Sequence, residues 1–71
     1  MYYLGIDLGG TNIAAGIVDE NCDIVLKDSI PTLRERKDIE IVRDMAKLSL
    51  KIIRDANINA SEIKSVGIGA P

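Results

Sequence analysis

The segment DLGGTN, residues 7–12, constrains the fold of this chain more than any other feature, because it places two adjacent glycines between two apolar stretches. Glycine pairs between strand-like segments are typical of the tight connection in a β-hairpin. We therefore expect one strand at residues 2–7, apolar on both faces and central in a sheet, and a second strand at residues 12–19. The small residues Ala14 and Gly16 of the second strand suit the close approach of another backbone.

Two further strands are indicated by the pattern. After a polar turn, residues 23–30 alternate with a period of two until Pro31, which predicts a half-exposed strand that ends at the proline. In that strand we place Ile24, Leu26 and Ile30 on one face and Val25, Lys27 and Ser29 on the other. Residues 64–70, KSVGIGA, predict a fourth strand, which we expect to be buried because its residues are small and apolar.

One amphipathic helix is predicted from Asp38 onward, because apolar residues recur there at steps of three and four. Its predicted apolar face consists of Val42, Met45, Ala46, Ser49, Ile52, Ile53 and Ala56. Charged residues fill the opposite face, where Lys51 and Asp55 have the spacing of an ion pair. We expect Asp38 to be the N-cap of this helix and Asn57 to end it.

The order strand–strand–strand–helix–strand indicates an α/β fold with a mixed sheet. Short turns join antiparallel neighbours, whereas a crossover helix returns the chain to a parallel partner. A chain of 71 residues is short for a domain that relies on a hydrophobic core alone, because such small domains bury only about 60% of their unfolded surface. We therefore expect the chain to be part of a larger lobe.

Composition argues against several classes of function. A net charge of −2 offers no basic surface for nucleic acid, and no apolar run is long enough to span a membrane. The first residues lack the pattern of a signal peptide, and Cys22 is the only cysteine, so we expect a cytoplasmic protein in which Cys22 is a surface thiol. Without histidine or a cysteine pair, we expect no zinc site in this chain.

Three interpretations of DLGGTN compete. A Walker-type phosphate loop has the spacing of Gly5 and Gly10, but it needs a lysine before its hydroxyl residue and a helix after it, and this chain has neither. A plain hairpin would use its glycines for positive φ angles. The plain hairpin leaves Asp7 unexplained, because a carboxylate that ends an apolar central strand is costly unless something pairs with it.

The third interpretation is a hairpin that binds phosphate. The glycines Gly9 and Gly10 let the backbone approach a ligand and direct N–H groups at phosphate oxygens. Thr11 adds a hydroxyl and Asn12 an amide, while Asp7 can hold Mg²⁺ directly or through water. We adopt this interpretation because it gives the carboxylate a partner.

The segment YLGIDLGGTNIAAGIVDENCDIV, residues 3–25, resembles the opening of sugar kinases of the ROK (repressor, open reading frame and kinase) family, in the actin-like ATPase superfamily. The family pattern hydrophobic-Gly-Ile-Asp-x-Gly-Gly-Thr is matched by residues 4–11. Asn12 stands where the family often has lysine. The ending VGIGAP resembles the family's Gly-x-Gly-x-Pro-Gly segment, which implies that Gly69, Ala70 and Pro71 lie beside the sugar. That ending also begins like a dinucleotide-binding fingerprint, and it is equally compatible with a plain buried strand.

The resemblance implies a ribonuclease H-like (actin-like ATPase) half-domain, with residues 1–71 forming part of the N-terminal nucleotide-binding lobe. It implies ATP-dependent phosphorylation of a hexose, with glucose as the expected substrate, and the cofactors ATP and Mg²⁺. Asp7 would hold Mg²⁺ through water, and Gly9, Gly10, Thr11 and Asn12 would bind the phosphates. The catalytic base and the family's zinc-binding Cys/His cluster would lie beyond these residues, in a homo-oligomeric parent whose partners are the sugar and the nucleotide.

Alternatives to a glucokinase remain open at this point. The parent could act on another sugar, such as an N-acetylated amino sugar, mannose or fructose. It could also be a sugar-responsive transcriptional repressor of the same family, although those repressors carry a DNA-binding helix-turn-helix before the hairpin, and a first strand that begins at residue 2 argues against this. A small α/β domain without a ligand is the remaining possibility.

Overall fold

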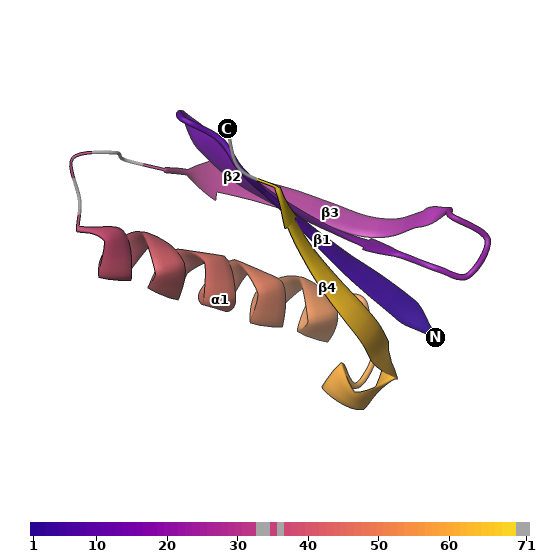
Figure 1. Cartoon of the computed structure of the whole chain (residues 1–71). Helices are drawn as coiled ribbons and strands as arrows, with labels where there is room; N and C mark the ends of the chain where they lie inside the picture. Colours follow the sequence, from indigo (N-terminus) through magenta and orange to yellow (C-terminus); the bar gives the residue numbers. More distant parts are fainter. Residues whose placement is uncertain (33–34, 36, 70–71) are drawn as a thin grey trace.

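The fold of the chain is a four-stranded sheet with one long helix on one of its faces (Figure 1). The structure is a computed structural model, and it describes residues 1–32, 35 and 37–69. The elements in chain order are β1 (Tyr2–Leu8), β2 (Asn12–Val18), β3 (Ile24–Pro31), α1 (Asp38–Asp55), the short 3-10 helix η1 (Ala60–Glu62) and β4 (Ile63–Gly69). The predicted order of strands and helix is confirmed, with η1 as an addition, and Pro31 ends β3 as expected.

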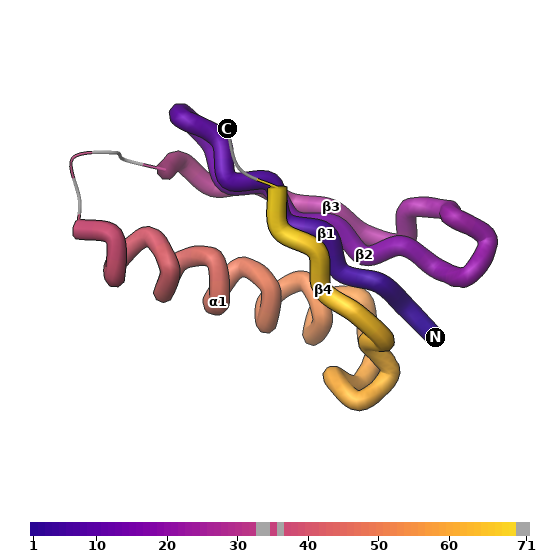
Figure 2. The backbone as a smooth tube through the Cα atoms, viewed as in Figure 1, coloured from indigo at the N-terminus to yellow at the C-terminus, as the bar shows by residue number. Residues whose placement is uncertain are grey.

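The sheet has the strand order β3-β2-β1-β4, so the first strand of the chain lies in its interior. Strand β1 pairs antiparallel with β2 and parallel with β4, and β2 pairs antiparallel with β3. The predicted mixed sheet is therefore confirmed. The tube in Figure 2 shows α1 running along one face of the sheet and returning the chain, through η1, to β4 beside β1.

The hydrophobic core lies between α1 and the neighbouring face of the sheet. Alternate residues of β1 and β2 point toward the helix, as the two-residue period of a strand requires. The buried apolar residues are Leu4, Ile6, Ile13, Ala15, Ile17, Leu48 and Ile52. The opposite face of the sheet, which we call the outer face, carries the intervening residues Tyr3, Gly5 and Asp7 of β1.

The predicted apolar face of α1 is wrong in part. Val42 and Ala46 are exposed, whereas Leu48, which the prediction left out, is buried in the core. The reason is that α1 carries two adjacent apolar stripes, and the sheet covers only one of them. The second stripe includes Ile39 and Val42, which are 55% and 56% exposed.

Two strand predictions also need correction. Strand β4 lies at an edge of the sheet, and its residues beyond Ile63 are exposed, so the expected burial of this strand is not found among the described residues. In β3, the register shifts between Ile17 and Val18, because Ile17 pairs with Leu26 but Val18 pairs with Ile24. The extra residue in β3 is a bulge, and it leaves Ile24 62% exposed instead of on the inner face.

The N-cap of α1 lies one residue earlier in the sequence than predicted. Lys37 occupies the N-cap position without a side-chain hydrogen bond, and Asp38 is the first helical residue. The prediction of Asp38 as N-cap is therefore wrong. Asp38 and Glu40 instead lie in the first turn, where a negative charge interacts favourably with the helix dipole.

The helix α1 ends at Asp55 with Ala56 as its C-cap, and Asn57 directly after the cap stops the helix as predicted. Asn57 adopts a positive φ of 58°, a conformation that asparagine tolerates better than most residues. Its N–H donates to the carbonyl of Arg54 at 3.0 Å, and the N–H of Ile58 donates to the carbonyl of Ile53 at 3.3 Å. This pair of hydrogen bonds is the Schellman arrangement, which satisfies two of the last carbonyl groups of a helix.

An ion-pair network joins β3 to α1. The predicted Lys51–Asp55 pair is confirmed at 3.4 Å, and Lys51 also donates a hydrogen bond to Asp28 at 2.6 Å. The hydrogen bond from Lys51, followed by one from the backbone N–H of Ser29, holds the pKa of Asp28 below its ordinary value. The same contact with Asp28 raises the pKa of Lys51.

No helix among the described residues is both long and apolar enough to cross a membrane.

Candidate functional site: the glycine hairpin

The hairpin between β1 and β2 is the centre of the predicted site. Leu8 pairs with Ile13, and the N–H of Gly9 donates to the carbonyl of Asn12 at 2.9 Å. No glycine among the described residues has a positive φ, so the positive φ angles expected of a plain glycine hairpin are not found. Gly9 is needed for a different reason, because a Cβ there would lie only 2.8 Å from the carbonyl oxygen of Asn12.

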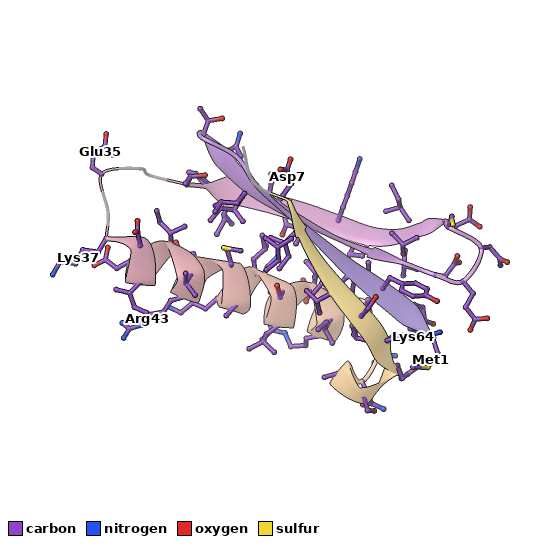
Figure 3. All side chains as sticks on the ribbon, in the orientation of Figure 1. Met1, Asp7, Glu35, Lys37, Arg43 and Lys64 are labelled. Carbon is purple, nitrogen blue, oxygen red and sulfur yellow. The ribbon has the colours of Figure 1, made fainter. Side chains whose placement is uncertain are left out.

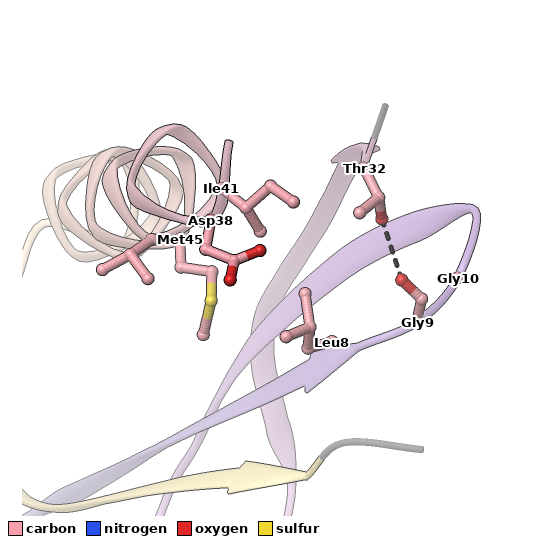
Figure 4. Close-up of a pocket in the computed structure, with 8 residues that line it drawn as sticks. Leu8, Gly9, Gly10, Thr32, Asp38, Ile41 and Met45 are labelled. Carbon is pink, nitrogen blue, oxygen red and sulfur yellow. Dashed lines mark hydrogen bonds between the residues drawn. The ribbon is translucent and has the colours of Figure 1, made fainter. Parts of the chain in front are cut away.

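Thr32, which follows β3, holds the hairpin from behind. Its Oγ1 donates to the carbonyl of Gly9 at 3.0 Å, shown as the dashed line in Figure 4, and its N–H donates to the carbonyl of Thr11 at 2.8 Å. Thr32 is only 3% exposed. Thr32 is not among the residues predicted from the sequence, where its only local signal is its position directly after the proline that ends β3.

The tip of the hairpin presents consecutive backbone N–H groups. Within the described part of the chain, the N–H groups of Gly10, Thr11 and Asn12 donate to no acceptor. The side-chain amide of Asn12 lies 3.5 Å from the hydroxyl of Thr11, so both polar side chains gather at the same turn. Successive N–H groups of this kind form a concave site for anions.

Asp7 lies on the outer face of the sheet, at the end of β1 (Figure 3). It is exposed, so the desolvation cost that we expected for this carboxylate does not arise among the described residues. Its register partners are Ala14 in β2 and Gly69 in β4. Because these neighbours are small and Asp7 forms no hydrogen bond or ion pair with a described residue, its carboxylate is accessible to a ligand.

A cavity of about 380 Å³ lies on the other side of the hairpin, between it and the first turns of α1 (Figure 4). Its lining residues are Leu8, Gly9, Gly10, Thr32, Asp38, Ile41, Val42 and Met45. The lining is mainly apolar and faces the helix. The polar groups of the hairpin tip and Asp7 therefore do not converge on this cavity.

Of the remaining predicted site residues, Gly69 lies within the described part of the chain. Gly69 is the last residue of β4 and pairs in register with Asp7, so the two predicted regions meet at one end of the sheet. Ala70 and Pro71 lie outside the described residues, and the sugar-side role of this segment stays a prediction. No group of three or more His, Cys, Asp or Glu residues that could hold a metal occurs in the described ranges. The predicted role of Asp7 in holding Mg²⁺ stays a prediction.

The chain matches one family model and several sugar kinases. A family model described as the ROK family matches residues 3–71. The probable L-xylulose kinase of Haemophilus influenzae is 36% identical over 77 residues, which cover 97% of this chain and 16% of that protein. The N-acetyl-D-glucosamine kinase of Pectobacterium atrosepticum is 34% identical over 71 residues, which cover 100% of this chain and 21% of that protein.

Two solved structures share the fold. The ROK hexokinase of Thermus thermophilus superposes with a TM-score of 0.86 at 30% identity, covering 100% of this chain and 23% of that one. A ROK-family glucokinase of Streptomyces griseus, in complex with glucose and AMPPNP, gives a TM-score of 0.81 at 30% identity, covering 99% of this chain and 20% of that one. The chain therefore spans about a fifth of the length of these proteins. Its fold is the half-domain of a ribonuclease H-like, actin-like ATPase.

Proposed function

Because this chain belongs to the ROK family, we propose that it forms the phosphate-binding part of an ATP-dependent sugar kinase, within the N-terminal lobe. The observation that carries the proposal is the hairpin tip, where the N–H groups of Gly10, Thr11 and Asn12 have no acceptor among the described residues. The nucleotide analogue in the Streptomyces griseus glucokinase supports ATP as the ligand.

Each residue of the hairpin has a distinct task in this proposal. The N–H groups of Gly10, Thr11 and Asn12 bind oxygens of the β- and γ-phosphates, together with the Thr11 hydroxyl and the Asn12 amide. Gly9 contributes through its missing side chain, because its own N–H already donates to Asn12. Asp7 faces solvent from the adjacent strand end and would hold Mg²⁺ through water.

Phosphoryl transfer depends mainly on positioning and on stabilising charge, since the protein itself does little covalent chemistry. A bound Mg²⁺ would neutralise part of the phosphate charge. The backbone of the hairpin would orient the phosphate chain, and Asp7 would hold the ion through water. The hairpin thus supplies orientation and charge stabilisation, and the base that accepts the sugar proton belongs to another part of the protein.

We propose a hexose as the substrate, with glucose first because the structural relatives include a glucokinase with bound glucose. The curated relatives include kinases of L-xylulose and of N-acetyl-D-glucosamine, so these sugars are the competing substrates. The hairpin is directed at phosphate, and it does not discriminate among the three sugars.

The test is Asp7→Asn in the full-length protein, assayed with ATP, Mg²⁺ and each of the three sugars. Loss of one charge-stabilising group of this kind should lower kcat by about 10²–10³-fold. The KM for the sugar should change little, because the carboxylate faces the phosphate site. A matched control is Asp23→Asn, which removes an exposed carboxylate from the turn between β2 and β3. If Asp7→Asn retains the kcat of the wild type, Asp7 has no role in phosphoryl transfer.

A further inference from the structure

We propose that Thr32 is a positioning residue of the phosphate site, although it cannot itself contact the phosphate. Its hydroxyl and its N–H hold the carbonyl groups of Gly9 and Thr11, and they thereby direct the N–H groups on the far side of the same two peptide planes toward the ligand. This inference rests on the proposed function, because it assumes that the hairpin tip binds nucleotide phosphate.

The geometry of the peptide group carries the first step. In a trans peptide the C=O of one residue and the N–H of the next lie in one plane and point in opposite directions. No described residue has a cis peptide bond. Since the Gly9 carbonyl points to Thr32, the N–H of Gly10 points away from Thr32. The Thr11 carbonyl is held in the same way, so the N–H of Asn12 also points away.

The second step concerns how the hairpin would close without Thr32. In a closed two-residue hairpin, the N–H of Asn12 would donate to the carbonyl of Gly9, in exchange for the bond from Gly9 to Asn12. Only the bond from Gly9 to Asn12 is present, and the Gly9 carbonyl accepts from the Thr32 hydroxyl instead. Thr32 therefore keeps the turn open and leaves the Asn12 N–H available to a ligand.

Third, the hydrogen bond between Thr32 and Gly9 involves a buried side chain. Thr32 is 3% exposed, so water does not readily replace its hydroxyl at the Gly9 carbonyl. Figure 4 shows Thr32 at the end of β3, with its hydroxyl directed at the carbonyl of Gly9. Removing the hydroxyl would leave the Gly9 carbonyl to find another donor, and the nearest one in the closed hairpin is the Asn12 N–H. The number of N–H groups available to phosphate would then fall.

The experiment compares Thr32→Val, which replaces the hydroxyl by a methyl group, with Thr32→Ser, which keeps the hydroxyl, in the full-length protein. Isothermal titration measures the affinity for AMPPNP and for AMP, which lacks the β- and γ-phosphates. We expect Thr32→Val to weaken AMPPNP binding about tenfold, the effect of losing a hydrogen bond to a charged group. AMP affinity should stay within about twofold, and Thr32→Ser should restore AMPPNP binding to near the wild-type value.

The matched control is Ser49→Ala. The Ser49 hydroxyl is also largely buried and also donates to a backbone carbonyl, that of Met45 at 2.8 Å, but it lies within α1. This variant should leave the ratio of AMPPNP to AMP affinity unchanged, because Ser49 has no contact with the hairpin in the described structure. Should Thr32→Val not fold, Thr32→Ala removes the same hydroxyl without adding bulk at the branch, and the same result is expected.

The possible outcomes separate the two proposals. A wild-type protein that binds no AMPPNP overturns the proposed function, and the role of Thr32 falls with it. A wild type that binds AMPPNP, beside a folded Thr32→Val or Thr32→Ala variant that binds it equally well, overturns the positioning role alone. Equal weakening of AMPPNP and AMP binding also overturns it, because a general loss of structure would affect both nucleotides.

Discussion

At the scale of single residues, the hairpin depends on a close approach and not on an unusual backbone angle. A Cβ at Gly9 would lie 2.8 Å from the carbonyl oxygen of Asn12, whereas a Cβ at Gly16 would find its nearest neighbour at an ordinary 3.7 Å. The backbone at Gly9 therefore leaves no space for a side chain, whereas the backbone at Gly16 in β2 has space for a methyl group.

This difference predicts the effect of two matched substitutions. In the full-length protein, Gly9→Ala should reduce the free energy of unfolding by about 1–3 kcal/mol, the usual cost of forcing atoms into occupied space. Gly16→Ala should be milder, since its methyl group meets only ordinary contacts. Thermal and urea unfolding of both variants provide the comparison, and equal loss of stability would show that the Asn12 carbonyl can move aside freely.

Residue type and adjacency led to the prediction of Asp7, Thr11 and Asn12 as residues of one phosphate site, a role that stays a prediction. They were not enough to predict Thr32, because its role depends on a contact with Gly9 across 23 positions of the chain. That contact arises from the register of β2 against β3, in which Asn12 pairs with Pro31. A sequence pattern read along the chain does not contain this register.

At the scale of elements, β3 and α1 are joined by the hydrogen bond between Lys51 and Asp28. This hydrogen bond keeps the pKa of Asp28 below its ordinary value in the folded state. A carboxylate with a lowered pKa contributes stability that is fully present above its unfolded pKa, about 3.9. The contribution disappears as the pH falls through the folded value, because both states are then protonated.

The variant Asp28→Asn should therefore melt below the wild type at pH 7 and low salt, and the difference should shrink below about pH 4. The effect should be small and weakened by salt, because both side chains are exposed. Asp23→Asn in the full-length protein is the control, since Asp23 has no ion pair with a described residue. A difference in melting temperature that persists or grows in acid would contradict a stabilising role for the hydrogen bond between Lys51 and Asp28.

For α1, the type of element was predicted correctly, but the face that packs on the sheet was not. The steps of three and four residues predicted α1, which spans Asp38–Asp55. They did not predict which side faces the sheet, because the stripe with Val42 and the stripe with Leu48 have the same period. Similarly, alternation predicted β3, but the bulge that exposes Ile24 leaves no mark on the alternating pattern.

At the scale of the whole molecule, the sheet has an apolar edge at β4. Val66 and Ile68 are 54% and 61% exposed, and no other described strand pairs with the free side of β4. An exposed edge strand with apolar side chains is a template for pairing with another chain. The predicted burial of KSVGIGA is not found, because no described residue covers this side of β4.

We therefore expect the 71-residue chain, prepared alone, to self-associate through β4. Ile68→Lys should shift the chain toward monomer in sedimentation velocity, because a charge on an edge strand opposes edge pairing. Leu50→Lys makes a similar change on α1, where Leu50 is 64% exposed, and should have a smaller effect. Circular dichroism confirms that the variants keep their secondary structure, and an equal shift by both would point to general hydrophobic association.

The sheet order β3-β2-β1-β4 also has a consequence for synthesis on the ribosome. Both partners of β2 are its neighbours along the chain, so the nascent polypeptide can complete the β1–β2–β3 meander with local contacts alone. The parallel partner of β1 is translated only after α1 and η1. Until that moment, the nascent chain carries β1 as a bare edge, so the strand that ends in Asp7 is exposed to other chains before it becomes interior.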